Sequence, residues 1–173
     1  MSACSKLASN MLSLQVSGAR LSCLDEHEQR WSIEIADIIL IAEYTTDEGP
    51  HLDDYFLVFV TVENGIPFFS KCTFYAEGRD EVFECLLKTF DMPVEFKLCS
   101  STAWASSVLW PRDLAGNEYF KFSKVRPSDL GSKIRKILLG PQLEYKISDS
   151  MRTYIDDATA KRTPGRGEPE DLK

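Results

Sequence analysis

One loop contains most of the residues whose types are suited to chemistry. Between Thr45 and Asp54 the sequence places four carboxylates and one of the two histidines of the chain. The candidate site residues are Asp47, Glu48, His51, Asp53 and Asp54. Hard cations prefer carboxylate oxygens, but this spacing lacks the alternating ligands and closing glutamate of a calcium loop. Acidic loops are usually solvated, so we interpret these residues as a partner-binding surface and expect no metal.

No catalytic constellation is recognisable. Nucleophilic catalysis needs a serine or cysteine with a base in reach, and the two imidazoles are His27, in a polar turn, and His51. No Gly-x-Ser-x-Gly or Walker-type motif occurs, and the single Gly-x-Gly, at 165–167, follows Pro164 and no strand. We expect no catalytic residue and no cofactor, while a hydrolase built from scattered carboxylates stays open as an alternative.

The net charge of -7 is unevenly distributed. Residues 1–120 carry 8 basic and 19 acidic side chains, net -11, whereas residues 121–173 carry 12 basic and 8 acidic, net +4. Nucleic-acid binding depends on clustered Lys and Arg, so we expect no nucleic-acid partner. The basic end either docks on the acidic body, which we favour, or meets a separate acidic partner.

Cysteine usage and hydropathy indicate the compartment. The five cysteines are widely spaced without a Cys-x-x-Cys pair, which fits neither a disulfide framework nor a zinc site. We interpret them as small buried hydrophobic side chains; they are Cys4, Cys23, Cys72, Cys85 and Cys99. No apolar run approaches the ~18 residues that span a bilayer, and polar residues interrupt the N-terminal stretch, so no signal peptide is expected. The sequence predicts a cytoplasmic protein.

Alternating apolar residues predict an antiparallel sheet between residues 12 and 125. Asn64-Gly65 predicts a two-residue type I′ hairpin, because that turn needs positive φ at both central positions. A break in the alternation near Asp37 predicts a bulge or tight corner. The expected strands are Leu12–Val16, Trp31–Ile35, Ile38–Ile41, Tyr55–Val62, Ile66–Tyr75, Val94–Leu98 and Tyr119–Ser123.

Three segments have helical periodicity, at Gly78–Phe90, Leu130–Leu138 and Ser148–Ala160. The second is basic and either packs on the sheet, as we expect, or lies on an anionic membrane surface. The sequence therefore predicts an α+β fold. Its expected parts are an N-terminal extension at 1–11, an antiparallel domain at 12–125, a C-terminal helical extension at 126–160 and a disordered tail at 161–173.

The stretch Ser100–Pro111 has no clear periodicity, yet it contains Trp104 and Trp110. Two tryptophans so close together either line a groove for an apolar ligand or fill the core. Large aromatic side chains are core fillers in most domains, so we expect core packing.

The run Trp31-Ser32-Ile33-x-Ile35-x-Asp37-Ile38, leading into a second strand, resembles the second and third strands of bacterial pleckstrin-homology-like domains. The resemblance covers roughly Leu12 to Phe122. The same segment is similar to small bacterial proteins of unknown role that have such a domain. It implies a strongly bent antiparallel sheet or partial barrel that binds or scaffolds. One departure is the helix at 78–90, which precedes the last strands, whereas the familiar fold places its main helix at the end.

These observations predict that the chain is a non-enzymatic intracellular interaction or scaffolding module, which binds another protein through the acidic loop. Oligomeric state is left open. An alternative is an acidic immunity-type protein that neutralises a basic toxin or nuclease, with the acidic body attracting its target.

Overall fold

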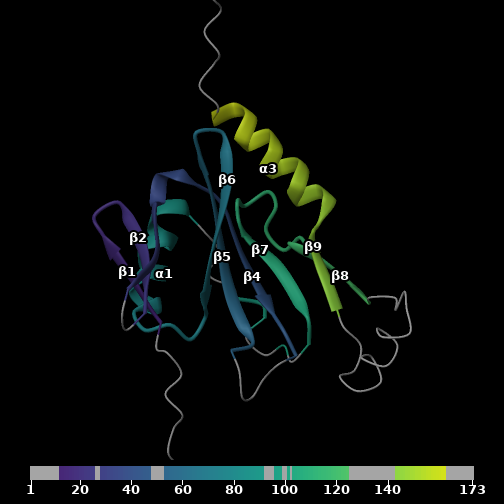
Figure 1. The fold of residues 1–173 in the computed structure, drawn as a ribbon, viewed down its shortest axis with the longest axis horizontal. Helices are drawn as coiled ribbons and strands as arrows, with labels where there is room; N and C mark the ends of the chain where they lie inside the picture. The colour runs from purple at the N-terminus through teal and green to yellow at the C-terminus, as the bar shows by residue number, and fades with distance from the viewer. Residues whose placement is uncertain are drawn as a thin grey trace, which may run out of the picture.

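The computed structural model describes residues 12–25, 28–47, 53–91, 96–98, 101, 103–124 and 143–162. In this part of the chain, antiparallel strands form three sheets, and two α-helices pack against them (Figure 1). The α+β class is therefore confirmed. None of the three described sheets closes into a barrel.

The N-terminal sheet has the order β1-β2-β3 and is antiparallel throughout. Gly18, with φ of 61°, lies in the tight turn between the first two strands. One face of the sheet is buried because apolar residues alternate with polar ones, as the period-2 pattern requires. The strand bounds are Ser13–Ser17 for β1, Arg20–Leu24 for β2 and Gln29–Glu34 for β3.

The central sheet has the order β6-β5-β4-β7. All eight residues of β4 are buried, because β5 and β7 pair with its two edges and both of its faces are covered. Asn64 and Gly65 have φ of 52° and 75°, so the predicted hairpin turn is confirmed. The bounds are Ile38–Thr45 for β4, Tyr55–Glu63 for β5, Ile66–Thr73 for β6 and Ala105–Trp110 for β7.

The phase break near Asp37 is a short 3-10 helix, η1, over Ile35–Asp37. It turns the chain from the N-terminal sheet into β4, and the β4–β5 register shifts between Ile38 and Leu40. The predicted corner is thus present, made by a helical turn followed by an irregularity in the strand.

A third sheet pairs β8, Phe120–Lys124, with β9, Leu143–Ile147, and helix α3, Asp149–Arg162, follows it directly. The helix was expected and the strand was not. The expected division after residue 125 separates β8 from β9, although the two strands pair with each other. Residues 143–162 thus belong to the same packed body as the central sheet.

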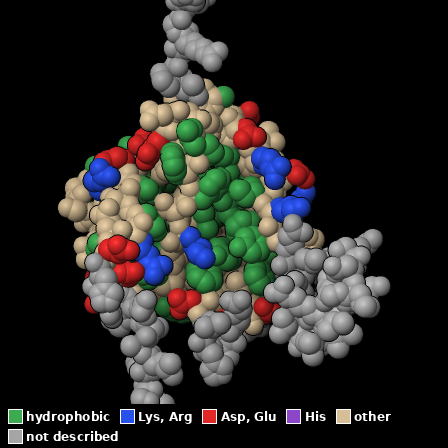
Figure 2. All heavy atoms as spheres, viewed as in Figure 1, with side chains coloured by type: hydrophobic (Ala, Val, Ile, Leu, Met, Phe, Trp, Pro, Cys, Tyr) green, Lys and Arg blue, Asp and Glu red, His purple; other side chains and the backbone are tan. Residues whose placement is uncertain are grey.

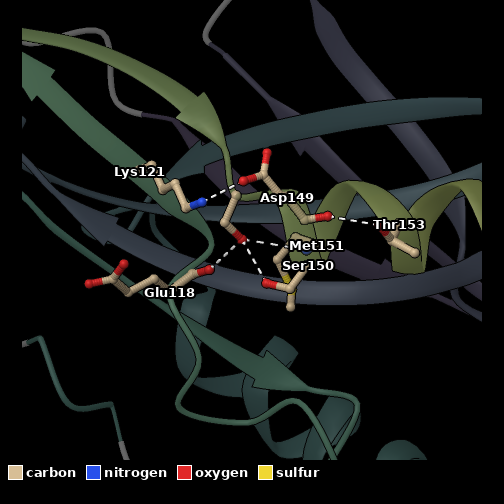
Figure 3. Close-up of polar contacts among 7 residues, drawn as sticks. Glu118, Lys121, Asp149, Ser150, Met151 and Thr153 are labelled. Carbon is tan, nitrogen blue, oxygen red and sulfur yellow. Dashed lines mark hydrogen bonds and ion pairs between the residues drawn. The ribbon is translucent and has the colours of Figure 1, made fainter.

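Ser148, which precedes Asp149, fixes the start of α3, and Figure 3 shows the residues around it. Its Oγ donates to the Glu118 carbonyl oxygen at 2.8 Å and accepts from the Met151 N–H at 3.4 Å. This is the N-cap interaction that satisfies a free amide in the first turn of a helix. The Lys121 ammonium, 2.5 Å from Asp149, lowers the pKa of that exposed carboxyl.

The central sheet separates two hydrophobic cores. The N-terminal core lies between this sheet, the N-terminal sheet and helix α1, Arg79–Phe90, which matches the helix predicted from periodicity. The C-terminal core lies under α3 and β8. The N-terminal core consists of Leu14, Leu21, Cys23, Ile33, Ile35, Ile38, Ile41, Leu57, Phe59, Cys72, Ala76, Val82, Phe83, Leu86 and Leu109. The C-terminal core consists of Ile39, Leu40, Ala42, Tyr44, Val58, Val60, Val62, Val108, Tyr119, Met151 and Ile155.

Helix α1 is joined to β1 through its N-terminal turn. The Leu14 amide donates to the Glu77 carbonyl oxygen at 2.7 Å, and the Glu77 amide donates to that of Leu12 at 2.9 Å. Gly78 follows with φ of 75°, and a Cβ on it would lie 2.3 Å from the Leu14 carbonyl oxygen. Only glycine fits this approach of two backbone segments.

Some expectations are corrected or lie outside the described residues. Residues 96–98 form a turn, so the strand predicted at Val94–Leu98 is wrong there, whereas β7 occupies the stretch that had no clear periodicity. The expected helix at Leu130–Leu138 lies outside the described residues, as does the tail beyond Arg162. None of the described helices is long and apolar enough to cross a membrane.

Candidate functional site

The acidic loop is closed at its base by the strands on either side. The Thr46 amide donates to the Asp54 carbonyl oxygen at 2.7 Å, just beyond the last β4–β5 pair. Two of the predicted site carboxylates accept hydrogen bonds from aromatic side chains. The Trp104 Nε1–H donates to Asp47 at 2.7 Å, and the Tyr75 hydroxyl donates to Asp54 at 2.8 Å.

The other three predicted site residues are placed differently. Asp53 is exposed at the base of the loop. Glu48 and His51 lie outside the described residues, as does His27. Among the described residues, no group of three His, Cys, Asp or Glu side chains is arranged to hold a metal ion.

A different carboxyl, Glu43, is fully buried in the middle of β4. The Tyr55 hydroxyl donates to its Oε2, and the Lys97 amide donates to its Oε1 at 3.1 Å. Burial raises the pKa of Glu43, an effect opposed by these hydrogen bonds. No local pattern predicted this contact, because it joins Glu43 to Lys97, 54 positions later in the chain. Its hydrogen bond with the Lys97 amide ties residues 96–98 to the sheet. Because the carboxyl is enclosed, a substrate cannot reach it.

A shallow pocket of 280 Å³ lies where the end of α3 meets β4. Two of its polar side chains hold the helix in place, and the first is Tyr154, whose hydroxyl donates to the Ile39 carbonyl oxygen at 3.0 Å. Arg162 donates to the backbone oxygens of Asp37, at 2.9 Å, and Ala36, at 3.2 Å. Tyr154 and Arg162 therefore clamp the helix to the sheet at this pocket, which Asp157 and Lys161 also line.

The most distinctive surface is a row of aromatic side chains on the α3 side of the central sheet. We call it the aromatic face; it consists of Phe56, Phe69, Trp104, Phe120, Phe122 and Tyr145. In Figure 2 hydrophobic side chains form a strip down this side of the molecule, over β6, β5, β4 and β7. Large exposed apolar patches on a folded chain commonly mark interaction sites.

Ring contacts connect the aromatic face across four strands and the segment before β7. Buried Tyr44 stacks on Phe56 at 5.0 Å between centroids and meets Phe120 edge-on at 5.3 Å. Phe120 in turn lies 5.0 Å from Tyr145, whose ring is 6.0 Å from Trp104. Edge-on and stacked pairs of this kind fix the rings in place, so the surface is preformed.

The face is also partly exposed and carries a cation. Phe69 is 50% exposed and Tyr145 is 49% exposed. The β5–β6 register sets Phe69 opposite Val60 and Lys71 opposite Val58, which places both side chains on the α3 side of the sheet. The Lys71 ammonium lies 4.7 Å from the centroid of the Phe56 ring, within the range of a cation–π contact.

Trp104 joins the aromatic face to the acidic loop. Its indole donates to Asp47 and packs 5.5 Å from Phe122 and 6.0 Å from Tyr145. Core packing was expected for both tryptophans. Both are half-buried; Trp110 packs against the N-terminal core, whereas Trp104 packs against Phe122 and Tyr145.

Sequence reasoning located the acidic loop and missed the aromatic face. The face is assembled from five separated stretches of chain, and which of their aromatic residues share one side depends on strand register. A partial signal was present in β6, where Pro67 and Lys71 are typical of an edge strand. Successive side chains of a strand point to opposite faces of the sheet, and Phe68 and Phe69 are both exposed by 45% or more.

Comparison with known proteins gives no relative. The chain matches no protein-family model, and neither the curated proteins nor the solved structures include a significant match.

Proposed function

We propose that this chain is a non-enzymatic module that binds another protein through the aromatic face and the adjoining acidic loop. The observation that carries the proposal is the continuity of the two surfaces at Trp104, which contacts Asp47 on one side and Tyr145 on the other. Protein interfaces are enriched in aromatic side chains at their centres and polar at their rims. A partner with apolar side chains bordered by Lys or Arg fits both halves of this surface.

The predicted contact residues keep their role in this proposal as the acidic rim: Asp47, Glu48, His51, Asp53 and Asp54. A bent antiparallel sheet with pleckstrin-homology-like character is a suitable platform, because loops on a rigid sheet commonly carry recognition. We place the protein in the cytoplasm, consistent with the free thiols of Cys23 and Cys72.

Site-specific photo-crosslinking in cells that naturally contain the protein tests this function. A photoreactive phenylalanine analogue at Tyr145 should give one discrete adduct with a partner protein. The same analogue at Lys88, exposed on α1 and remote from the aromatic face, should not. Equal labelling from both positions, or none from Tyr145, would remove the aromatic face from the proposal.

The acidic rim is tested separately. Asp53→Asn removes an exposed rim charge, whereas Glu84→Gln removes an equally exposed charge on α1. If the rim attracts a basic partner, Asp53→Asn should reduce adduct yield and Glu84→Gln should leave it unchanged.

Neutralisation of a basic toxin or nuclease is the second candidate, and the charge of -11 over residues 1–120 favours it. Association driven by long-range charge slows steeply as salt increases. If the captured partner is a basic toxin and the association rate falls steeply with added salt, neutralisation is supported. A partner captured equally fast at low and high salt contradicts it.

A further inference from the structure

The N-terminal core contains two thiols in contact. Cys23 on β2 and Cys72 on β6 are 0% and 1% exposed, and their sulfur atoms are 3.6 Å apart. They belong to different sheets and are separated by 49 positions in the sequence. Their contact therefore bridges the two layers that enclose this core.

The surrounding structure holds the two sulfur atoms together. Cys23 pairs across the β2–β3 ladder with Trp31, and the Trp31 indole donates to the Lys71 carbonyl oxygen at 2.9 Å. Lys71 immediately precedes Cys72, so one hydrogen bond fixes β3 to β6 next to the thiols. A disulfide has an S–S length of about 2.05 Å. The two sulfur atoms, 3.6 Å apart, therefore need only a small approach to form that bond.

We propose that Cys23 and Cys72 form a reversible disulfide that locks the N-terminal sheet onto β6 when the protein meets a hydroperoxide. This goes beyond the proposed binding function and does not depend on it. Small oxidants of this class suit the site, because the thiols are buried and a bulky disulfide reagent would have to open the core.

The chemistry balances with hydrogen peroxide as the oxidant. The Cys23 thiolate attacks one peroxide oxygen, the O–O bond breaks, and hydroxide leaves with the proton that the thiol released, giving a sulfenic acid and water. The Cys72 sulfur then attacks the Cys23 sulfur, the S–O bond breaks, and a second water leaves. Two thiols are oxidised by two electrons in all, and one peroxide is reduced to two waters.

The two thiols differ in a way that suits these roles. The hydrogen bond with Cys72 lowers the pKa of Cys23, and the same contact together with burial raises the pKa of Cys72. Cys23 is thus the thiol that ionises first, and the thiolate is the reactive form. Cys85, half-buried on α1, offers a comparison within the same chain.

The test treats the full chain with hydrogen peroxide, blocks remaining thiols with N-ethylmaleimide and maps the peptides by mass spectrometry. We expect loss of two blocked thiols, a linked peptide pair containing Cys23 and Cys72, and a rise in Tm of roughly 10 °C for a loop of this length. Reduction with dithiothreitol should reverse both changes. Cys85→Ser should behave as the wild type, and Cys72→Ser should lose the linked pair and the rise in Tm.

The wild-type map decides the question even if Cys72→Ser does not fold. Cys23 and Cys72 recovered as separate blocked or over-oxidised residues would overturn the proposal. A linked peptide pair without a higher Tm would refute the proposal that the disulfide locks the N-terminal sheet onto β6.

Discussion

Replacing Glu43 separates the two effects of its carboxyl group, which accepts two hydrogen bonds and also carries a buried charge when it ionises. Glutamine keeps an acceptor for the Lys97 amide and a polar partner for the Tyr55 hydroxyl, and it has no charge. Alanine removes the side-chain acceptor for both the Tyr55 hydroxyl and the Lys97 amide. The two variants therefore report the cost of the charge and the value of the hydrogen bonds separately.

The sign of the pH dependence follows from the direction of the shift. Burial raises the pKa of Glu43 above its ordinary value of 4.5, so the folded state binds this proton more tightly than the unfolded state does. The resulting stability is complete below the unfolded pKa and is lost as pH rises through the folded pKa. Each unit between the two pKa values changes the free energy of unfolding by about 1.4 kcal/mol.

Urea unfolding of the wild type and variants over a pH series that starts below 4.5 and ends near neutrality measures both effects. Glu43→Gln should reduce the loss of stability with rising pH and should equal or exceed the wild type near neutrality. Glu43→Ala should cost about 2–5 kcal/mol, because the Tyr55 hydroxyl and the Lys97 amide lose their buried acceptor and a cavity forms. Glu63→Gln, exposed at the end of β5, is the control.

A Glu43→Gln variant whose stability changes with pH as much as that of the wild type would refute the role of the buried charge. An alanine variant no less stable than the glutamine variant would refute the value of the two hydrogen bonds.

Two further substitutions test how the helices are joined to the sheets, each by thermal unfolding. Gly78→Ala should destabilise by more than ~2 kcal/mol, because the new Cβ would meet the Leu14 carbonyl oxygen at 2.3 Å. Gly18→Ala, with a similar φ and open space around it, should cost only about 1–2 kcal/mol, and equal losses would contradict the collision argument. Ser148→Ala should cost about 1–2 kcal/mol through loss of the N-cap of α3, whereas Ser17→Ala, at an exposed position at the end of β1, should stay within ~0.5 kcal/mol; the reverse order would show that the cap does not fix this helix.

Local patterns in the sequence predicted the elements that depend on local chemistry. Asn64-Gly65 specified its hairpin because few residue pairs tolerate positive φ twice. The stripe of Val82, Phe83 and Leu86 specified α1 and its buried side. β7 was not predicted because it begins Ala-Ser-Ser and so has no alternation, and its pairing with β4 provides the order that its own residues do not.

The candidate site was predicted only in part for a related reason. A cluster of carboxylates in one loop is visible in the sequence, so the acidic loop could be proposed as a contact surface from the sequence alone. The aromatic face depends on the register of β5 with β6 and of β8 with β9, which brings Phe56, Phe69 and Tyr145 to one side. Long-range register is not encoded in any single stretch of the chain, and Trp104 could therefore not be assigned to a surface.

The position of β4 and β5 between two cores has a consequence for how the molecule opens. Residues 38–73 pair in sequence order, so their ladders close short loops and should form early during folding. The outer layers come from different parts of the chain, the N-terminal sheet and α1 on one side and β8, β9 and α3 on the other, and each shields a different side of the same pair of strands. Amide hydrogens of β4 should therefore exchange only on global unfolding, while those of α3, which covers one side of the sheet, should exchange through local detachment of the helix that breaks the contacts of Tyr154 and Arg162. Such detachment would uncover the C-terminal core and leave the N-terminal core packed.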